Sequence, residues 1–177
     1  MGRPQRHRRG DRSLRVRLAR PDDIPALPLL EDSAGQAFRG TDQDWIADDI
    51  VIEADAYPPL VAAGGVWVSE ADDGTVTGFV ATEPLDDALH ILEMAVHQDH
   101  QRQGIGARLM AAALDHGKRA SYPAATLTTF RTIPWNAPFY ARLGFLILDE
   151  PSPALQAILA EEAARGLTDR CAMRLVF

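Results

Sequence analysis

The residues best suited to hold a ligand form one short stretch: Gln101, Arg102, Gln103, Gly104, Ile105, Gly106, Ala107 and Arg108. The stretch follows an apolar run typical of a strand and precedes a run with helical periodicity. The two glycines let the backbone approach an anion closely, and the unpaired N–H groups at a helix start attract negative charge. The stretch therefore predicts a site for the phosphates of a nucleotide-like cofactor.

The glycine loop alone leaves several interpretations open, because glycines at a helix start also occur as ordinary turn and capping chemistry. A Walker loop requires Lys followed by Ser or Thr after its last glycine, where this chain has Ala107 and Arg108. A dinucleotide-binding loop requires a small residue at the position of Leu109. Both of these nucleotide-binding alternatives fail.

Composition indicates one globular domain with an unusual N-terminus. The chain has 177 residues, of which 46% are apolar and 24% charged, and its formal net charge is −7. Eight arginines and one acid lie within the first 20 residues. We expect residues 1–13 to be a disordered Arg-rich extension and residues 14–177 to be a single domain. A nucleic-acid arm is the alternative for the arginines, but the acidic remainder argues against nucleic acid as the main partner.

The sequence also predicts a soluble, cytoplasmic protein. It contains no apolar run that could span a bilayer, and no apolar h-region follows the N-terminal arginines. The single cysteine, Cys171, excludes an internal disulfide and is expected to be a small buried side chain. His97 and His100 lack a second-ligand pattern, so no metal is expected. A homodimer through the C-terminal strand stays open.

Periodicity and turn residues predict alternating strands and helices. Strands are expected over residues 14–19, 60–70, 75–82, 88–97, 124–130, 145–148 and 170–177, and helices over 21–34, 38–56, 105–119, 136–142 and 154–165. Pro58 and Pro59 are expected to end the second helix, and residues 71–74 to close a hairpin. This order predicts an α/β fold with a mixed, mostly antiparallel twisted sheet and helices on both faces.

The order of elements, the glycine loop and residues 135–145, Trp-Asn-Ala-Pro-Phe-Tyr-Ala-Arg-Leu-Gly-Phe, together resemble the GNAT superfamily of N-acetyltransferases. The loop matches the family's Gln/Arg-x-x-Gly-x-Gly/Ala pattern, and the later segment matches its Asn followed by Phe-Tyr and Leu-Gly-Phe. The chain departs from the family at one point. Only Ala137 and Pro138 separate Asn136 from Phe139, where family members often have more residues.

The resemblance implies an N-acetyltransferase that uses acetyl-CoA. Residues 101–108 would hold the pyrophosphate, and the backbone of Met94, Ala95 and Val96 would pair with the pantetheine arm, where a free N–H would polarise the thioester carbonyl. The resemblance implies further cofactor contacts by Asn136, Phe139 and Tyr140. The acceptor would be a primary amine of a small molecule or peptide, attacking directly in a ternary complex. The alternative function is a non-catalytic regulatory module that binds acyl-CoA.

Three side chains are candidates for proton transfer. Tyr140 is the predicted acid, because the reference pKa of a phenol, about 10, is close to that of a thiol, about 8.5. His90 and Glu93 are the candidate bases, and His90 aligns with a catalytic Glu of some histone-type members of the family. Strand alternation predicts that Glu93 and His90 point to opposite faces, so at most one would face the acceptor. A water chain in place of both stays open.

Overall fold

The structure is a computed structural model that describes residues 14–48 and 54–177. In these residues seven strands form one sheet in the order β1-β2-β3-β4-β5-β7-β6. Their bounds are β1 Arg15–Leu18, β2 Val66–Glu70, β3 Val76–Leu85, β4 Ala88–Val96, β5 Ala124–Phe130, β6 Leu146–Ile147 and β7 Arg170–Val176. Every neighbouring pair is antiparallel except β4 and β5, which are parallel. The predicted mixed, mostly antiparallel sheet is confirmed.

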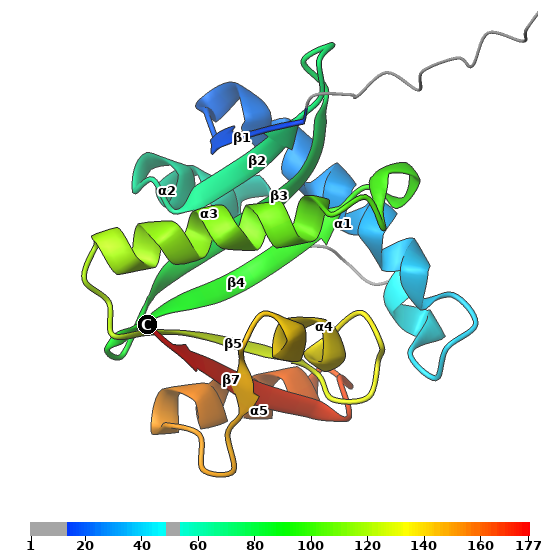
Figure 1. The fold of residues 1–177 in the computed structure, drawn as a ribbon. Helices are drawn as coiled ribbons and strands as arrows, with labels where there is room; N and C mark the ends of the chain where they lie inside the picture. Colours follow the sequence, from blue (N-terminus) through cyan, green and yellow to red (C-terminus); the bar gives the residue numbers. More distant parts are fainter. Residues whose placement is uncertain (1–13, 49–53) are drawn as a thin grey trace, which may run out of the picture.

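Helices cover both faces of this sheet (Figure 1). The α-helices are α1 Leu27–Gly35, α2 Tyr57–Ala62, α3 Ile105–Arg119, α4 Ala137–Arg142 and α5 Pro153–Ala164. Helix α3 lies across β2, β3 and β4 on one face, and α4 lies on the same side. Helix α1 packs against β3 and β4 on the opposite face, where α5 packs against β5 and β7. No helix in the described ranges is long and apolar enough to cross a membrane.

Two apolar clusters hold these layers together. The first joins α3 and α4 to the sheet through side chains such as Ile91, Leu109 and Phe145. The second joins α1 and α2 to the other face through Leu27, Tyr57, Val68 and Phe79 in particular. Because successive residues of a strand face opposite sides, β3 contributes Val80 to the first cluster and Phe79 to the second.

The strongly periodic segments match their predicted bounds. Helix α3 and strand β5 begin and end at the residues that periodicity indicated, and the hairpin turn between β2 and β3 contains Gly74 at φ +85°. Ile105, Leu109 and Ala113 of α3 are buried as predicted, whereas Leu114 is half-buried.

The predicted helix over residues 38–56 is wrong. Short 3-10 helices occupy Asp44–Asp48 and Ala54–Ala56, and residues 49–53, with Ile50 and Val51, lie outside the described ranges, as does the predicted extension over residues 1–13. The role assigned to Pro58 and Pro59 is also wrong, since they lie in the first turn of α2 rather than after a helix. A first-turn residue has no intrahelical N–H partner to lose, so proline is well tolerated there.

The strand predicted from residue 60 starts later, because the helix that begins with these prolines continues past it. Residues 60–62 belong to α2, and β2 begins only at Val66. The predicted helix over 21–34 is also divided, because Pro21–Ala26 forms a 3-10 helix before α1 begins. The apolar composition of residues 60–62 is compatible with a strand or a helix, and that of residues 21–26 with an α-helix or a 3-10 helix. In each case the prolines in or just before the segment decide between the two.

Candidate functional site

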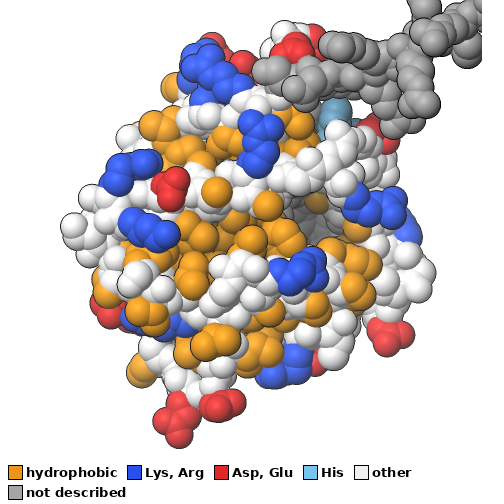
Figure 2. All heavy atoms as spheres, viewed as in Figure 1, with side chains coloured by type: hydrophobic (Ala, Val, Ile, Leu, Met, Phe, Trp, Pro, Cys, Tyr) orange, Lys and Arg blue, Asp and Glu red, His pale blue; other side chains and the backbone are white. Residues whose placement is uncertain are grey.

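The site is built around a separation between β4 and β5. These parallel strands pair only where Leu89, His90 and Ile91 face residues 125–127. Beyond this point the strands diverge, and the last residues of β4 have no strand on that side (Figure 1). The surface is hollowed beside the N-terminal end of α3, above α4 (Figure 2). The end of β4 therefore presents a backbone edge next to a hollow.

A β-bulge in β4 coincides with this separation. Ala81 of β3 pairs with Glu93 and Thr82 pairs with Ile91, which leaves Leu92 without a partner. The extra residue shifts the alternation of side chains, so Ile91 and Met94 both pack on the α3 side. His90 and Glu93 consequently lie on the same face, away from α3. The prediction that they point to opposite faces is wrong, because it assumed an unbroken strand.

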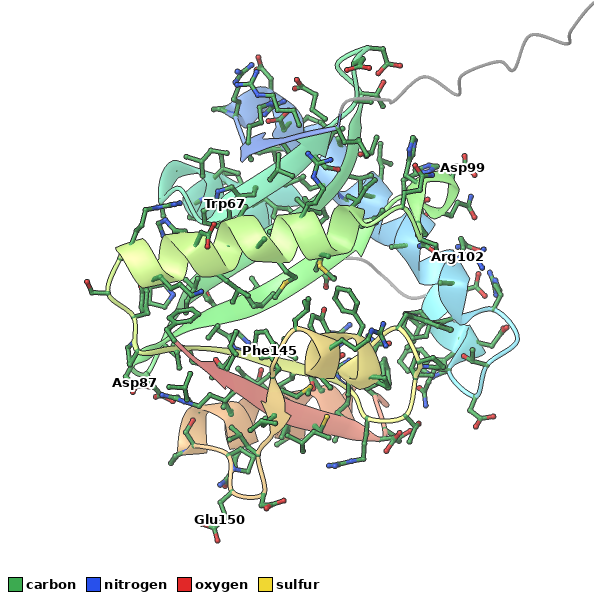
Figure 3. All side chains as sticks on the ribbon, in the orientation of Figure 1. Trp67, Asp87, Asp99, Arg102, Phe145 and Glu150 are labelled. Carbon is green, nitrogen blue, oxygen red and sulfur yellow. The ribbon has the colours of Figure 1, made fainter. Side chains whose placement is uncertain are left out.

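The glycine loop connects β4 to α3 and leaves the helix start exposed. Gly104 adopts φ +80°, a conformation that favours glycine, and a Cβ atom there would meet nothing within 4 Å. No side chain of the described residues caps the first turn of α3. Arg102 belongs to the same loop and is exposed (Figure 3). The arrangement offers an anion free backbone N–H groups at the start of α3, with a positive side chain in the same loop.

Other side chains of the loop hold it in place. Gln101 Nε2 donates to the Val96 carbonyl at 3.1 Å, and Gln103 Nε2 donates to the Asp99 carbonyl at 3.2 Å. The Arg108 guanidinium donates to the Leu14 carbonyl. These three predicted cofactor residues therefore shape the loop in this structure.

Glu93 lies at the backbone edge of β4. Its Oε1 accepts a hydrogen bond from the Met94 backbone N–H at 2.9 Å. Burial raises the pKa of the Glu93 carboxyl, although this hydrogen bond and the charge of Arg170 oppose the rise. A carboxyl group with a raised pKa is suited to accept and release a proton near neutral pH.

Tyr140 approaches the same place from α4. It is 8% exposed, and burial, with a smaller contribution from the Glu93 charge, raises the pKa of its hydroxyl. Its ring packs edge-on against Phe139, at 5.1 Å between centroids. A Cβ atom on Gly106 would lie 3.6 Å from both the Phe139 ring and Met94 Cε. The start of α3, the start of α4 and the end of β4 thus meet at one point, and Tyr140 stays protonated there.

Asn136 immediately precedes α4. Its Oδ1 is buried and accepts no hydrogen bond from the described residues. A buried acceptor of this kind is costly unless a donor reaches it, so a ligand amide or hydroxyl would fit here.

A half-buried ion pair on the α5 side was not anticipated from the sequence. Arg170 donates to both oxygens of Glu162, at 2.6 Å and 3.0 Å, and the Thr128 hydroxyl donates to Glu162 at 2.6 Å. The Arg170 guanidinium also stacks over the Phe130 ring at 4.6 Å. No spacing rule links residues on α5, β5 and the start of β7, so only the folded chain identifies this group.

His90 lies deeper, where β4 and β5 still pair. It is 2% exposed, and its Nδ1 lies 3.0 Å from the Thr126 hydroxyl. Burial lowers the pKa of the His90 imidazole to about 4, so the ring is neutral at physiological pH.

A cavity of about 520 Å³ lies at the end of β5. The 3-10 segment after α1, the β5–α4 connection and the α5–β7 connection surround it. Its lining consists of Thr41, Asp42, Gln43, Phe130, Thr132, Ile133, Thr168 and Asp169. The Thr132 hydroxyl donates to Asp169 at 2.6 Å, and Gln43 donates to Thr168 at 3.2 Å, so the wall is held by its own hydrogen bonds.

Residues 62–146, which contain both the glycine loop and α4, match the acetyltransferase (GNAT) domain. The chain contains a GNAT acetyltransferase domain. A probable N-acetyltransferase 14 from Mus musculus is 34% identical over 61 residues, which are 33% of this chain and 30% of the mouse protein. The chain therefore matches less than a third of that relative's length.

Solved structures with the same fold cover almost the whole chain. PaiA N-acetyltransferase from Thermoplasma acidophilum, in complex with coenzyme A, superimposes with a TM-score of 0.70 at 14% identity, over 93% of this chain and 99% of that one. Rv2747 from Mycobacterium tuberculosis, in complex with CoA and NLQ, gives 0.68 at 24% identity, over 92% and 98%. The shared fold thus extends beyond residues 62–146 to almost the whole chain.

The buried, neutral His90 predicts a loss of stability in acid. An unfolded chain protonates this imidazole near its reference pKa of about 6.5, whereas the folded protein does so only near pH 4. Between these values the unfolded state binds more protons, so stability falls as pH falls, by up to about 1.4 kcal/mol per pH unit.

Replacing His90 with Gln should flatten the stability profile between pH 6.5 and pH 4. Urea unfolding at a series of pH values measures this slope. His100→Gln, in the loop before α3, serves as the control and should keep the wild-type slope. An equal slope in His90→Gln and the wild type would show that His90 does not cause the loss of stability in acid.

Proposed function

We propose that the protein binds acetyl-CoA, with its pyrophosphate at the glycine loop. The support is the uncapped first turn of α3, the open space at Gly104 and the exposed Arg102 in the same loop. The relatives that hold coenzyme A share this fold. The pantetheine arm would pair with the open edge of β4 at Met94 and Val96, whereas the backbone of Ala95 between them faces β3, and Asn136 Oδ1 would accept from an amide of the ligand.

The proposed reaction is transfer of the acetyl group to a primary amine by direct attack. The observation that carries this proposal is the meeting of Glu93 and Tyr140 at the open edge of β4. Glu93 accepts the proton that the attacking amine loses. The Tyr140 hydroxyl donates a proton to the departing sulfur. Acetyl-CoA supplies the activated acyl group, and the backbone N–H of Met94 would stabilise the charge on its carbonyl oxygen.

Glu93 is a better candidate for the base than His90. His90 is buried where β4 and β5 still pair, so an amine in the hollow could not reach it directly. Glu93 lies beyond the bulge, at the unpaired edge. The same two residues, Glu93 and Tyr140, argue against a purely regulatory acyl-CoA-binding module, which would need neither.

The acceptor is proposed to be a small molecule or a peptide amine that enters from the cavity at the end of β5. Phe130 lines this cavity and contacts Arg170, whose charge acts on both Glu93 and Tyr140. Asp42 and Asp169 would favour a positively charged acceptor. A screen of amines and peptides for acetylation tests this assignment directly.

Replacing Gly104 with Ala should weaken binding of CoA at least tenfold. Alanine at φ +80° costs about 1 kcal/mol, and its Cβ would occupy the space proposed for phosphate. Calorimetry with CoA measures the affinity. Gly74→Ala is the matched control, because Gly74 has φ +85° and open space but lies in the β2–β3 turn. Equal affinities in the two variants would refute the phosphate assignment.

Replacing Tyr140 with Phe should slow turnover about 100-fold or more while changing CoA affinity less than about twofold, because only the donated proton is lost. Steady-state acetylation of an amine found in the screen measures the first quantity, and calorimetry the second. Tyr122→Phe, in the α3–β5 connection, is the control and should retain turnover. Wild-type turnover in Tyr140→Phe would exclude Tyr140 from the mechanism.

A further inference from the structure

The Met94 backbone N–H faces the side of β4 that β5 has left. His97 N–H donates to the Thr77 carbonyl of β3 at 2.9 Å. In an antiparallel pair the backbone groups of alternate residues point to the partner strand, so those of His97, Ala95 and Glu93 point to β3. The backbone groups of Val96 and Met94 therefore point away from β3. The side-chain contacts agree with this, since Gln101 reaches the Val96 carbonyl and Glu93 reaches the Met94 N–H.

The hydrogen bond to Met94 places a carboxylate where the proposed reaction requires an acyl oxygen. A backbone N–H has one hydrogen to donate, so Glu93 Oε1 at 2.9 Å and a thioester carbonyl oxygen would compete for it. A hydrogen bond to a charged acceptor is stronger than one to a neutral carbonyl. The carbonyl therefore gains less from this N–H than it would if Glu93 were elsewhere.

We propose that Glu93 holds the Met94 N–H until an acyl carbonyl displaces it, and that this displacement frees the carboxylate to receive the acceptor amine. The inference rests on the proposed function. It gives Glu93, besides its proposed role as the base, a second role in sensing whether the bound coenzyme carries an acyl group. With free coenzyme A the carboxylate stays on Met94, and with an acyl-coenzyme A it turns to the amine.

The charges around Glu93 permit this exchange. The charge of Arg170 acts on Glu93, but both oxygens of Glu162 already accept hydrogen bonds from this guanidinium. The Glu162 charge opposes ionisation of Glu93, and the neutral Tyr140 brings no counter-charge. Glu93 therefore has no dedicated ion-pair partner among these neighbours, and its hydrogen bond with Met94 is free to exchange.

The test compares acetyl-CoA with S-ethyl-CoA, which has the same size but lacks the carbonyl oxygen. Calorimetry without any amine gives both affinities for the wild type and for Glu93→Ala. In the wild type we expect the two ligands to bind within about threefold of each other. In Glu93→Ala the preference for acetyl-CoA should rise about tenfold, because its carbonyl no longer displaces a charged acceptor. A preference equal to that of the wild type overturns the proposal.

A second measurement uses the wild type alone and so does not depend on the folding of a variant. Burial raises the pKa of the Glu93 carboxyl, and protonation weakens its hold on Met94, so the preference for acetyl-CoA over S-ethyl-CoA should rise as the pH is lowered from 8 to 5. Burial also keeps the Tyr140 hydroxyl protonated, and ionisation of the shared CoA phosphates cancels in the ratio. The rise should be absent in Glu93→Gln, and an equal rise there also overturns the proposal. Binding of neither ligand to any form would instead refute the proposed function.

Discussion

The whole site depends on the early separation of β4 from β5. Three residue pairs hold these parallel strands together, and the unpaired Leu92 then turns the rest of β4 away. A strand edge inside a protein is costly, because each backbone N–H and C=O needs a partner. This chain meets part of that need with two of its own side chains, Gln101 and Glu93. The edge is therefore available to a ligand without being left unsatisfied.

The electrostatics of the site follow from how one cation is shared by two carboxyl groups. Arg170 makes a two-point contact with Glu162, and the Thr128 hydroxyl adds a third hydrogen bond to that carboxylate. At Glu93 the charge of Glu162 opposes that of Arg170. This opposition explains why burial dominates the pKa of the Glu93 carboxyl and raises it. The ion pair thus leaves Glu93 with little net positive charge to stabilise its ionised form.

Sequence periodicity predicted the framework of the site but not its geometry. The bounds of α3 and β5 could be read from apolar spacing and turn residues, because both elements bury one regular face. The bulge could not, since Leu92 continues the apolar run and carries no glycine or other turn residue. One unpaired residue was enough to place the side chains of His90 and Glu93 on the same face of the sheet instead of on opposite faces. Arg170 and Glu162 were missed for a different reason. Their ion pair joins two elements, β7 and α5, that meet only in the folded chain.

The shortened segment after Asn136 shows how local sequence and the site are linked. Two residues separate Asn136 from Phe139, and the second of them, Pro138, lies in the first turn of α4, where its missing N–H costs nothing. The helix can therefore start at once and place Phe139 against Gly106 and Met94. A longer connection would move Phe139 and Tyr140 relative to the end of β4 unless other changes compensated. The short spacing is thus compatible with the site because proline supplies the helix start, and Asn136 Oδ1 remains buried beside it with no donor among the described residues.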